Sequence, residues 1–282
     1  MKSPNVDPID VALNEDIGEG DVTTDFFVSE TAEADARIVA RERAILAGIE
    51  TAAEVFRRVD GNLTITLLRK DGSEVNAGES VMDLQGQAHS ILKAERVALN
   101  FLQRLSGIAT LTRTFVDAAA NEHVKILDTR KTTPSLRALE KAAVVAGGGA
   151  NHRFGLFDMV LVKDNHLALT ANIEAFAEAV RKFRDAHPNM KIEVEADTLD
   201  QVHALLEIDG IDVIMLDNMK PAQIREAVAL GKNKVRFEAS GGITLKNIRQ
   251  IAATSVDYIS IGALTHSPRA IDFSLEITHD GA

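Results

Sequence analysis

The sequence predicts an α/β protein in two parts: an N-terminal α/β domain with an open sheet and helices, joined to an incomplete (β/α) barrel. From about residue 124, six short apolar segments alternate with helical segments, which is the pattern of parallel strands with helical crossovers. Before that point, strand-like segments are followed by one long helical segment. No G-x-G-x-x-G follows a first strand, which disfavours a dinucleotide-binding doubly wound sheet. A barrel with fewer than eight recognisable strands is therefore favoured.

The N-terminal part begins with an acidic segment that we expect to be an irregular, solvated loop. Residues 14–21 place two glycines among four carboxylates. Strand-like patterns follow at Ala36–Leu46, Leu63–Leu67 and Val81–Leu84, with a tight turn at Asp71-Gly72. From Ser90 the apolar residues follow helical spacing, and Gly107 is expected to interrupt that helix.

The elements of the expected barrel follow in order. The strands are Val124–Leu127, Met159–Val162, Ile192–Val194, Val213–Leu216, Val235–Glu238 and Tyr258–Ile261. The helices are 135–146, 172–186, 198–208, 221–230 and 244–253, with Pro221 at a first helical position and Thr244 as an N-cap. The tail alternates again from Ile271 to Ile277 and is expected to return to the first sheet. The expected domains are therefore 1–110 with 267–282, and 111–266.

Composition excludes several classes of protein. The chain has 282 residues, 45% apolar content and a net charge of −11, so it can bury a core and does not resemble a general nucleic-acid binder. It has no run of about 18 apolar residues that would span a membrane. There is no cysteine, which excludes disulfides, thiolate metal sites and cysteine nucleophiles. Because no secretory signal is recognised at the N-terminus, we expect a cytoplasmic protein.

Polar or glycine-rich residues follow all six expected strands. They are Asp128–Lys131, Lys163–His166, Glu195 with Asp197, Asp217-Asn218, Ser240–Gly242 and Gly262-Ala263. In a (β/α) barrel the active site lies at the carboxyl ends of the strands, so six such ends favour a shared site. One such end alone would mean little.

The charges at these ends separate by sign. Arg130, Lys131, Lys163 and the preceding His152-Arg153 form a cationic side, which suggests an anionic substrate. Glu195 and Asp217 form an acidic side, which suits Mg²⁺. Ser240-Gly241-Gly242 can offer backbone N–H groups to a phosphate.

Plainer interpretations remain open for several of these residues. The loop cations could be solvated, Glu195 and Asp217 could pair with Lys163, and His152 could be an ordinary partly buried histidine. Gly147-Gly148-Gly149 is more readily a helix stop than a phosphate loop. Lys163 could also be a Schiff-base lysine, as in barrel aldolases.

Several of these segments form one ordered series that closely resembles the quinolinate phosphoribosyltransferase family, also called nicotinate-nucleotide pyrophosphorylase (carboxylating). The series runs Asp128-Thr129-Arg130-Lys131-Thr132, Gly147-Gly148-Gly149 with Asn151-His152-Arg153, Lys163-Asp164-Asn165-His166, Leu216–Met219 and Glu238–Ile243. Glu15-Asp16, Gly20–Thr24, Glu95-Arg96 and Leu105–Ala109 extend it to the N-terminal part. The resemblance covers nearly the whole chain, from about residue 11 to 278.

The resemblance implies an enzyme of NAD biosynthesis that joins quinolinate to phosphoribosyl diphosphate, giving nicotinate mononucleotide, pyrophosphate and CO₂. By similarity, Arg130, His152, Arg153 and Lys163 would hold the quinolinate carboxylates, Thr129 would be a substrate-binding position, and Lys131 would lie near the diphosphate or the reacting centre. Glu195 and Asp217 would face the ribose hydroxyls and Mg²⁺. Ser240-Gly241-Gly242 and Gly262-Ala263 would hold the 5′-phosphate. The family forms at least homodimers, in which the position of Arg96 reaches the partner's site.

Two other hypotheses are kept beside the transferase. One is a Schiff-base lyase on the same barrel, which would use Lys163. The other is a repurposed relative associated with molybdenum transport, against which the intact Arg130, Lys131, Lys163, Glu195 and Asp217 argue. The sequence leaves open a dimer against a hexamer, Mg²⁺ against Mn²⁺, the kinetic order, the regulation and the exact role of Lys131.

Overall fold

The computed structural model describes residues 7–164, 166, 169 and 172–278. The chain divides into two compact units, which we call the sheet unit (Met1–Arg113, Thr132–Gly148 and Thr265–Ala282) and the barrel unit (Thr114–Lys131 and Gly149–Leu264). Unlike the boundaries expected from the sequence, this division places 132–148 with the sheet unit. Among the described helices, none has the length and apolar character that a membrane crossing requires.

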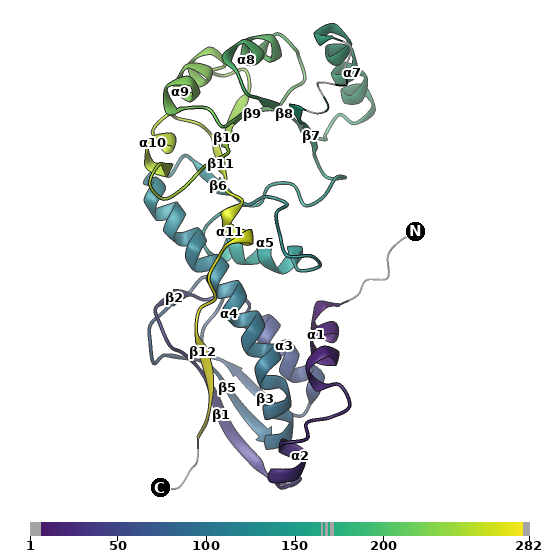
Figure 1. Ribbon diagram of the computed structural model, residues 1–282, viewed down its shortest axis with the longest axis vertical. Coiled ribbons are helices and arrows are strands. Elements are labelled where there is room, and N and C mark those ends of the chain that lie inside the picture. The colour runs from purple at the N-terminus through teal and green to yellow at the C-terminus, as the bar shows by residue number, and fades with distance from the viewer. Residues whose placement is uncertain (1–6, 165, 167–168, 170–171, 279–282) are drawn as a thin grey trace. The chain divides into compact units, whose positions relative to one another are not determined.

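The sheet unit is built on a four-stranded antiparallel sheet in the order β12-β1-β5-β3. Its strands are β1 (Glu33–Ala40), β3 (Thr64–Leu67), β5 (Ser80–Gln87) and β12 (Phe273–Thr278), and β2 (Ala44–Ile45) pairs separately with β4 (Glu74–Val75). The helices are α3 (Ile49–Val59), α4 (Ala88–Ala119), which belongs to this unit up to Arg113, and α5 (Arg137–Ala146), with α1 and α2 before the sheet. In Figure 1, α3 and α4 lie along one face of this sheet. Alternate residues of β1, including Ile38, contribute to a core that is mainly aliphatic and includes a few phenylalanines.

Residues 8–17 and 24–27 are helical, so the expectation of an irregular loop over residues 14–21 was wrong for 14–17 and correct for 18–21. Helix α1 (Pro8–Ile17) begins where the Asp7 side chain accepts a hydrogen bond from the Ile9 N–H, at 2.9 Å. Helix α2 (Thr24–Phe27) follows Asp21, whose carboxylate accepts the Thr24 N–H at 3.0 Å. The acidic residues therefore serve as helix-start signals as well as solvated charges.

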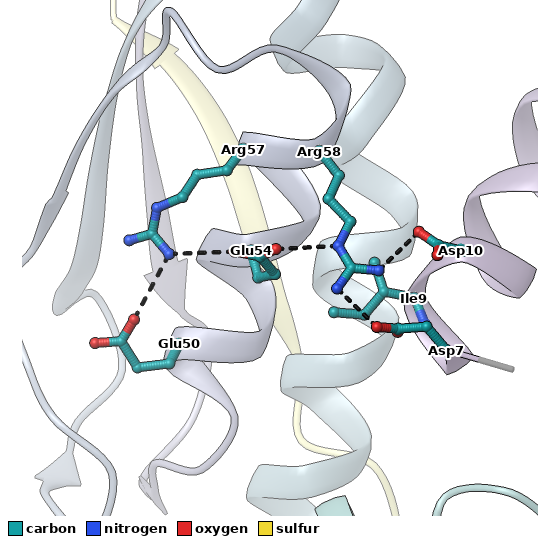
Figure 2. Close-up of polar contacts among 7 residues, drawn as sticks. All are labelled: Asp7, Ile9, Asp10, Glu50, Glu54, Arg57 and Arg58. Atoms are coloured by element: carbon teal, nitrogen blue, oxygen red, sulfur yellow. Dashed lines mark hydrogen bonds and ion pairs between the residues drawn. The ribbon is translucent and has the colours of Figure 1, made fainter. Parts of the chain in front are cut away.

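Helix α1 is also tied to α3 by charge, as Figure 2 shows. The Arg58 guanidinium on α3 lies 2.7 Å from carboxylate oxygens of both Asp7 and Asp10, and 3.0 Å from Glu54. Ile9 of α1 is buried in the core of the sheet unit. Two features therefore hold the N-terminal helix in place: the packing of Ile9 in the core and the exposed ion-pair network around Arg58.

Helix α4 is continuous, so the interruption expected at Gly107 was also wrong. A Cβ atom at Gly107 would lie 2.1 Å from the carbonyl oxygen of Arg269. The glycine is therefore explained by the close passage of the chain that leads into β12, not by a helix break. That strand pairs with β1 from Ala40↔Phe273 to Asp35↔Thr278, so the predicted return of the tail to the first sheet is confirmed.

The barrel unit contains a six-stranded parallel sheet in the order β6-β11-β10-β9-β8-β7. The strands are β6 (Lys125–Leu127), β7 (Val160–Val162), β8 (Ile192–Ala196), β9 (Val213–Asp217), β10 (Arg236–Ser240) and β11 (Tyr258–Ser260). The helices are α7 (Ile173–Ala186), α8 (Leu199–Leu206), α9 (Pro221–Leu230) and α10 (Ile248–Ala252), and α11 (Ala263–His266) follows β11. Figure 1 shows the strands in an arc with α8, α9 and α10 along its outer side. The predicted incomplete barrel is confirmed.

The helix starts in this unit agree with the sequence prediction in all but one case. Pro221 occupies the first turn of α9, and Thr198 caps α8 in a capping box with Gln201. Thr244 is not the N-cap of α10, because Asn247 holds that position and its side chain accepts the Thr244 N–H at 2.8 Å. The helix therefore begins later than the sequence indicated.

Candidate active site

The carboxyl ends of the barrel strands bring most of the expected site residues to one edge of the sheet. The parallel register places Ser240 opposite Asp217, while Glu195 lies opposite Met215 on the neighbouring strand. Thr129, Arg130 and Lys131 follow β6, Lys163 follows β7, and Gly262-Ala263 follow β11. Asn165, part of the sequence motif, lies outside the described residues. Arg96 is not part of this edge: it is an exposed residue of α4 in the sheet unit.

A lysine and three carboxylates form the acidic part of this edge. The Lys163 Nζ lies 3.2 Å from Glu195 Oε2, so one of the plainer interpretations, internal pairing, is correct for Glu195. Burial raises the pKa of Glu195, and the Lys163 charge opposes that rise. Carboxylate oxygens of Glu195, Asp197 and Asp217 lie within 4.8 Å of one another. This all-oxygen set fits a hard divalent cation such as Mg²⁺.

A glycine turn follows β10 beside Asp217-Asn218. Gly241 and Gly242 both have positive φ, at 84° and 62°, and a Cβ at Gly241 would lie 2.2 Å from the Asn218 side-chain oxygen. The Asn218 N–H donates to the Ser240 carbonyl at 2.9 Å, which joins the two strand ends. Successive backbone N–H groups in left-handed turns form concave sites for anions, so this turn can receive a phosphate.

The other glycine run has a structural role. Gly147 follows the last residue of α5 as its C-cap, and a Cβ there would lie 2.4 Å from the Ala109 carbonyl oxygen. Gly148 has a φ of 90° and packs against Arg113. The interpretation of this run as a helix stop, which the sequence favoured, is confirmed.

The cationic side of the site contains a short segment that runs beside β6. Ala150 forms a parallel bridge with Leu127, and the His152 N–H donates to Asp128 Oδ1 at 2.8 Å. The Arg153 guanidinium donates to the Met159 carbonyl at 3.3 Å. Burial and the nearby Arg130 charge lower the pKa of Arg153. Two guanidinium groups that repel each other in this way are suited to receive an anion between them.

Two buried carboxyls that sequence reasoning missed lie in the barrel interior. Glu193 on β8 and Glu238 on β10 are each 1% exposed, and their Oε2 atoms lie 3.0 and 3.6 Å from the His152 Nε2. Burial raises the pKa of Glu193 to about 7 and that of Glu238 to about 8. The missed signal was strand alternation, which puts Glu193 on the face of Glu195 and Glu238 on the face of Ser240. Asp197, close to Glu195 and Asp217, was noted in the sequence but not assigned to the metal set.

Family models and known proteins match the chain over nearly its whole length. Residues 21–106 match the model of the quinolinate phosphoribosyl transferase N-terminal domain, and residues 108–276 match that of its C-terminal domain. The chain belongs to the quinolinate phosphoribosyltransferase family. The strand-end motifs named above therefore belong to the C-terminal domain of the family, and Arg96 belongs to the N-terminal domain.

Individual relatives agree with this family. A probable nicotinate-nucleotide pyrophosphorylase (carboxylating) of Bacillus subtilis is 46% identical over 265 residues, which is 94% of this chain and 90% of that protein. A quinolinate phosphoribosyltransferase (decarboxylating) of Nicotiana tabacum is 43% identical over 95% of this chain and 81% of its own length. The solved structure of the nicotinate-nucleotide pyrophosphorylase of Francisella tularensis has a TM-score of 0.89 at 40% identity and covers 98% of both chains.

Proposed function

We propose that this chain transfers the phosphoribosyl group of phosphoribosyl diphosphate to quinolinate with decarboxylation, giving nicotinate mononucleotide, pyrophosphate and CO₂ in NAD biosynthesis. The observation that carries the proposal is the shared strand-end edge. Cations, carboxylates and a positive-φ glycine turn follow neighbouring strands there, in a chain that is 46% identical to a carboxylating pyrophosphorylase.

The reaction needs no protein nucleophile. The lone pair of the quinolinate ring nitrogen forms the bond to the ribose C1, while the bond from C1 to the diphosphate oxygen breaks and its electrons leave with pyrophosphate. The carboxylate beside the ring nitrogen then leaves as CO₂. The electron pair of that bond stays on the ring carbon, next to the positive nitrogen, until the carbon takes a proton. The protein's part is to bind, orient and stabilise charge.

The residues of the edge divide these tasks by charge. Arg130, Arg153 and Lys163 bind the two carboxylates of quinolinate, with Thr129 and His152 beside them. Lys131 faces the diphosphate. Ser240-Gly241-Gly242 and Gly262-Ala263 bind the 5′-phosphate through backbone N–H groups. Glu195 and Asp217 face the ribose hydroxyls.

The cofactor of this proposal is Mg²⁺, with Mn²⁺ as the alternative. Glu195 and Asp217 would hold it, and Asp197 is within reach of the same position. When bound, Mg²⁺ neutralises charge on the departing diphosphate. Turnover should therefore stop on chelation and return when Mg²⁺ is added.

A turnover assay with quinolinate and with nicotinate tests the main proposal. Pyrophosphate and CO₂ should appear with quinolinate, and nicotinate should be a poor substitute, because it lacks one carboxylate. Arg153→Ala should weaken quinolinate binding by about 1.5–3 kcal/mol, the contribution of a charged hydrogen bond. Arg225→Ala, which changes an exposed arginine of α9, is the matched control. Equal use of both substrates would refute the carboxylating assignment.

The proposed assembly is a homodimer or a larger homo-oligomer in which Arg96 enters the partner's site. Its support is exposure: the Arg96 side chain is 58% exposed, while Phe26 and Phe27 in the sheet unit and Phe157 in the barrel unit are 81%, 79% and 72% exposed. Mixing Arg96→Ala and Arg153→Ala chains tests it, at a quinolinate concentration too low for either variant alone to turn over. A site shared between subunits should recover about a quarter of the activity, because half of the random dimers contain one intact site. No recovery would place Arg96 in its own subunit's site.

The location of the protein also stays a proposal. We propose the cytoplasm, on the support of a chain without cysteine. Relatives named as mitochondrial or chloroplastic show that this family is not restricted to one compartment. Detection of a tagged full-length chain in fractionated cells would decide the location.

A further inference from the structure

Three buried polar side chains lie together in the barrel interior, and two of them, the glutamates, have no role in the reaction as described. The side chains of His152, Glu193 and Glu238 are 7%, 1% and 2% exposed, and they come from three separate segments of the chain. Glu193 and Glu238 precede the site residues Glu195 and Ser240 by two positions on the same strand faces. Each therefore lies about 7 Å below the edge at which substrate binds.

The hydrogen bonds of His152 define the state of its ring. Its Nδ1 accepts the backbone N–H of Arg153 at 2.7 Å, so Nδ1 carries no hydrogen. The ring is then the neutral form with its hydrogen on Nε2, and that atom faces the oxygens of Glu193 and Glu238. An imidazole held in this way has no second N–H to offer a substrate carboxylate.

The same contacts fix the backbone at Arg153 from two sides. Asp128, which is fully buried, accepts the N–H of His152, and the His152 ring accepts the N–H of Arg153. Glu193 and Glu238 lie on the other side of that ring, next to its Nε2 atom. The side chain of Arg153 starts from this fixed backbone and is held further by the Met159 carbonyl. A small movement of the ring would therefore move the arginine that binds the substrate.

The surroundings argue against a divalent cation as the reason for this cluster. A cavity of about 210 Å³ is lined by the three side chains, and Lys125, Arg153 and Lys191 line it as well. A divalent ion there would face three positive groups, while a neutral imidazole against a carboxyl pair is compatible with them.

We propose that Glu193 and Glu238 are positioning residues, which act through the neutral ring of His152 to hold Arg153 in place for a quinolinate carboxylate. The inference rests on the proposed function, because it names quinolinate as the anion. It also changes the expected role of His152, from a direct ligand of the substrate to a link between the carboxyl pair and the arginine.

The kinetic test is Glu238→Leu, which keeps most of the volume of the side chain and removes both carboxyl oxygens that face the His152 ring. The KM for quinolinate should rise about tenfold, while the KM for phosphoribosyl diphosphate and kcat should stay within about threefold. Asp212→Asn is the matched control: Asp212 accepts the Ile192 N–H at 2.7 Å at the amino end of β8, so it is structural. A purely structural role for Glu238 would change both KM values equally or neither, and either outcome would overturn the inference.

The second test uses the wild-type protein and does not depend on activity. In chains labelled with ¹⁵N-histidine, His152 should show the neutral form with hydrogen on Nε2, identified among eight histidines by its loss in His152→Asn. A ring with hydrogen on Nδ1, or a charged ring, would overturn the inference. So would a stoichiometric metal ion that is lost in Glu238→Gln. Absent turnover with the expected tautomer would instead refute the proposed function.

Discussion

Glu140 in the sheet unit and Glu238 in the barrel unit are equally inaccessible, at 0% and 1% exposed, but their surroundings differ in sign. Glu140 receives hydrogen bonds from the Arg104 guanidinium at 2.8 Å and from the Thr133 hydroxyl at 2.7 Å. Glu238 faces another buried carboxyl, and burial together with that neighbour outweighs the contacts with His152 and Ser260, which lower its pKa. The first arrangement compensates a buried charge, and the second raises the pKa of the carboxyl instead.

This difference teaches how burial should be interpreted in each unit. A buried carboxylate that accepts hydrogen bonds from several donors stabilises its own unit. Its removal leaves the positively charged partner without a counter-charge. A buried carboxyl next to a second buried carboxyl destabilises the fold whenever it is charged, so stability does not explain why the residue is there. In the barrel unit the explanation is the proposed substrate site, because Glu195 and Ser240 follow the two glutamates by two residues on β8 and β10.

The largest effect on stability should come from Glu140→Ala. The change leaves Arg104 without its main partner inside the sheet unit, and breaking such a pair costs about 3 kcal/mol. Urea denaturation should show this loss in the free energy of unfolding. Glu50→Ala, which removes an exposed carboxylate 3.8 Å from Arg57, serves as the control and should change it by less than about 1 kcal/mol. Equal losses would mean that burial does not distinguish the two glutamates.

Glu238→Gln should have the opposite sign, and its effect should depend on pH. The pKa of Glu238 is raised from 4.5 to about 8, so the folded protein binds its proton more tightly than the unfolded chain. The stability that this proton provides is present at low pH and is lost as the pH rises through about 8. The glutamine cannot ionise, so this variant should be more stable than wild type at about pH 9, by roughly 1–3 kcal/mol.

The measurement for this second prediction is thermal unfolding of both proteins across that pH range. The difference between them should be small near pH 5, grow as the pH rises, and level off above pH 8. Asp212→Asn again provides a control that leaves the buried pair intact. A difference that does not vary with pH would show that Glu238 keeps the same protonation state in the folded and unfolded protein.

The comparison also explains how much the sequence could predict. The alternation of apolar strands with helices predicted the parallel sheet, and the polar strand ends predicted which residues share an edge. Both are local patterns. Glu193 and Glu238 were missed because their burial depends on how the sheet curves around its interior, which no short segment encodes. Gly107 was misjudged for a similar reason, since its neighbour is Arg269, far away in the sequence.

The smallest effect should come from Arg58→Ala at the surface of the sheet unit. Arg58 contacts three carboxylates, of Asp7, Asp10 and Glu54, and its hydrogen bond is the main reason that the pKa of Asp7 is lowered. The Arg58 side chain is still 26% exposed, so water and salt screen the network (Figure 2). We expect a loss of about 1 kcal/mol or less in the free energy of unfolding, and a smaller loss at high salt.

Arg58→Lys is the control for this last prediction, because it keeps the charge but cannot contact three carboxylates in the same planar arrangement. It should fall between wild type and Arg58→Ala in urea denaturation at low salt. If Arg58→Ala destabilised the protein as much as Glu140→Ala, and equally at all salt concentrations, the number of partners rather than burial would determine the strength of an ion pair here. The contrast between the exposed network and the buried carboxylates would then fail, and with it the argument that burial makes Glu238 unusual.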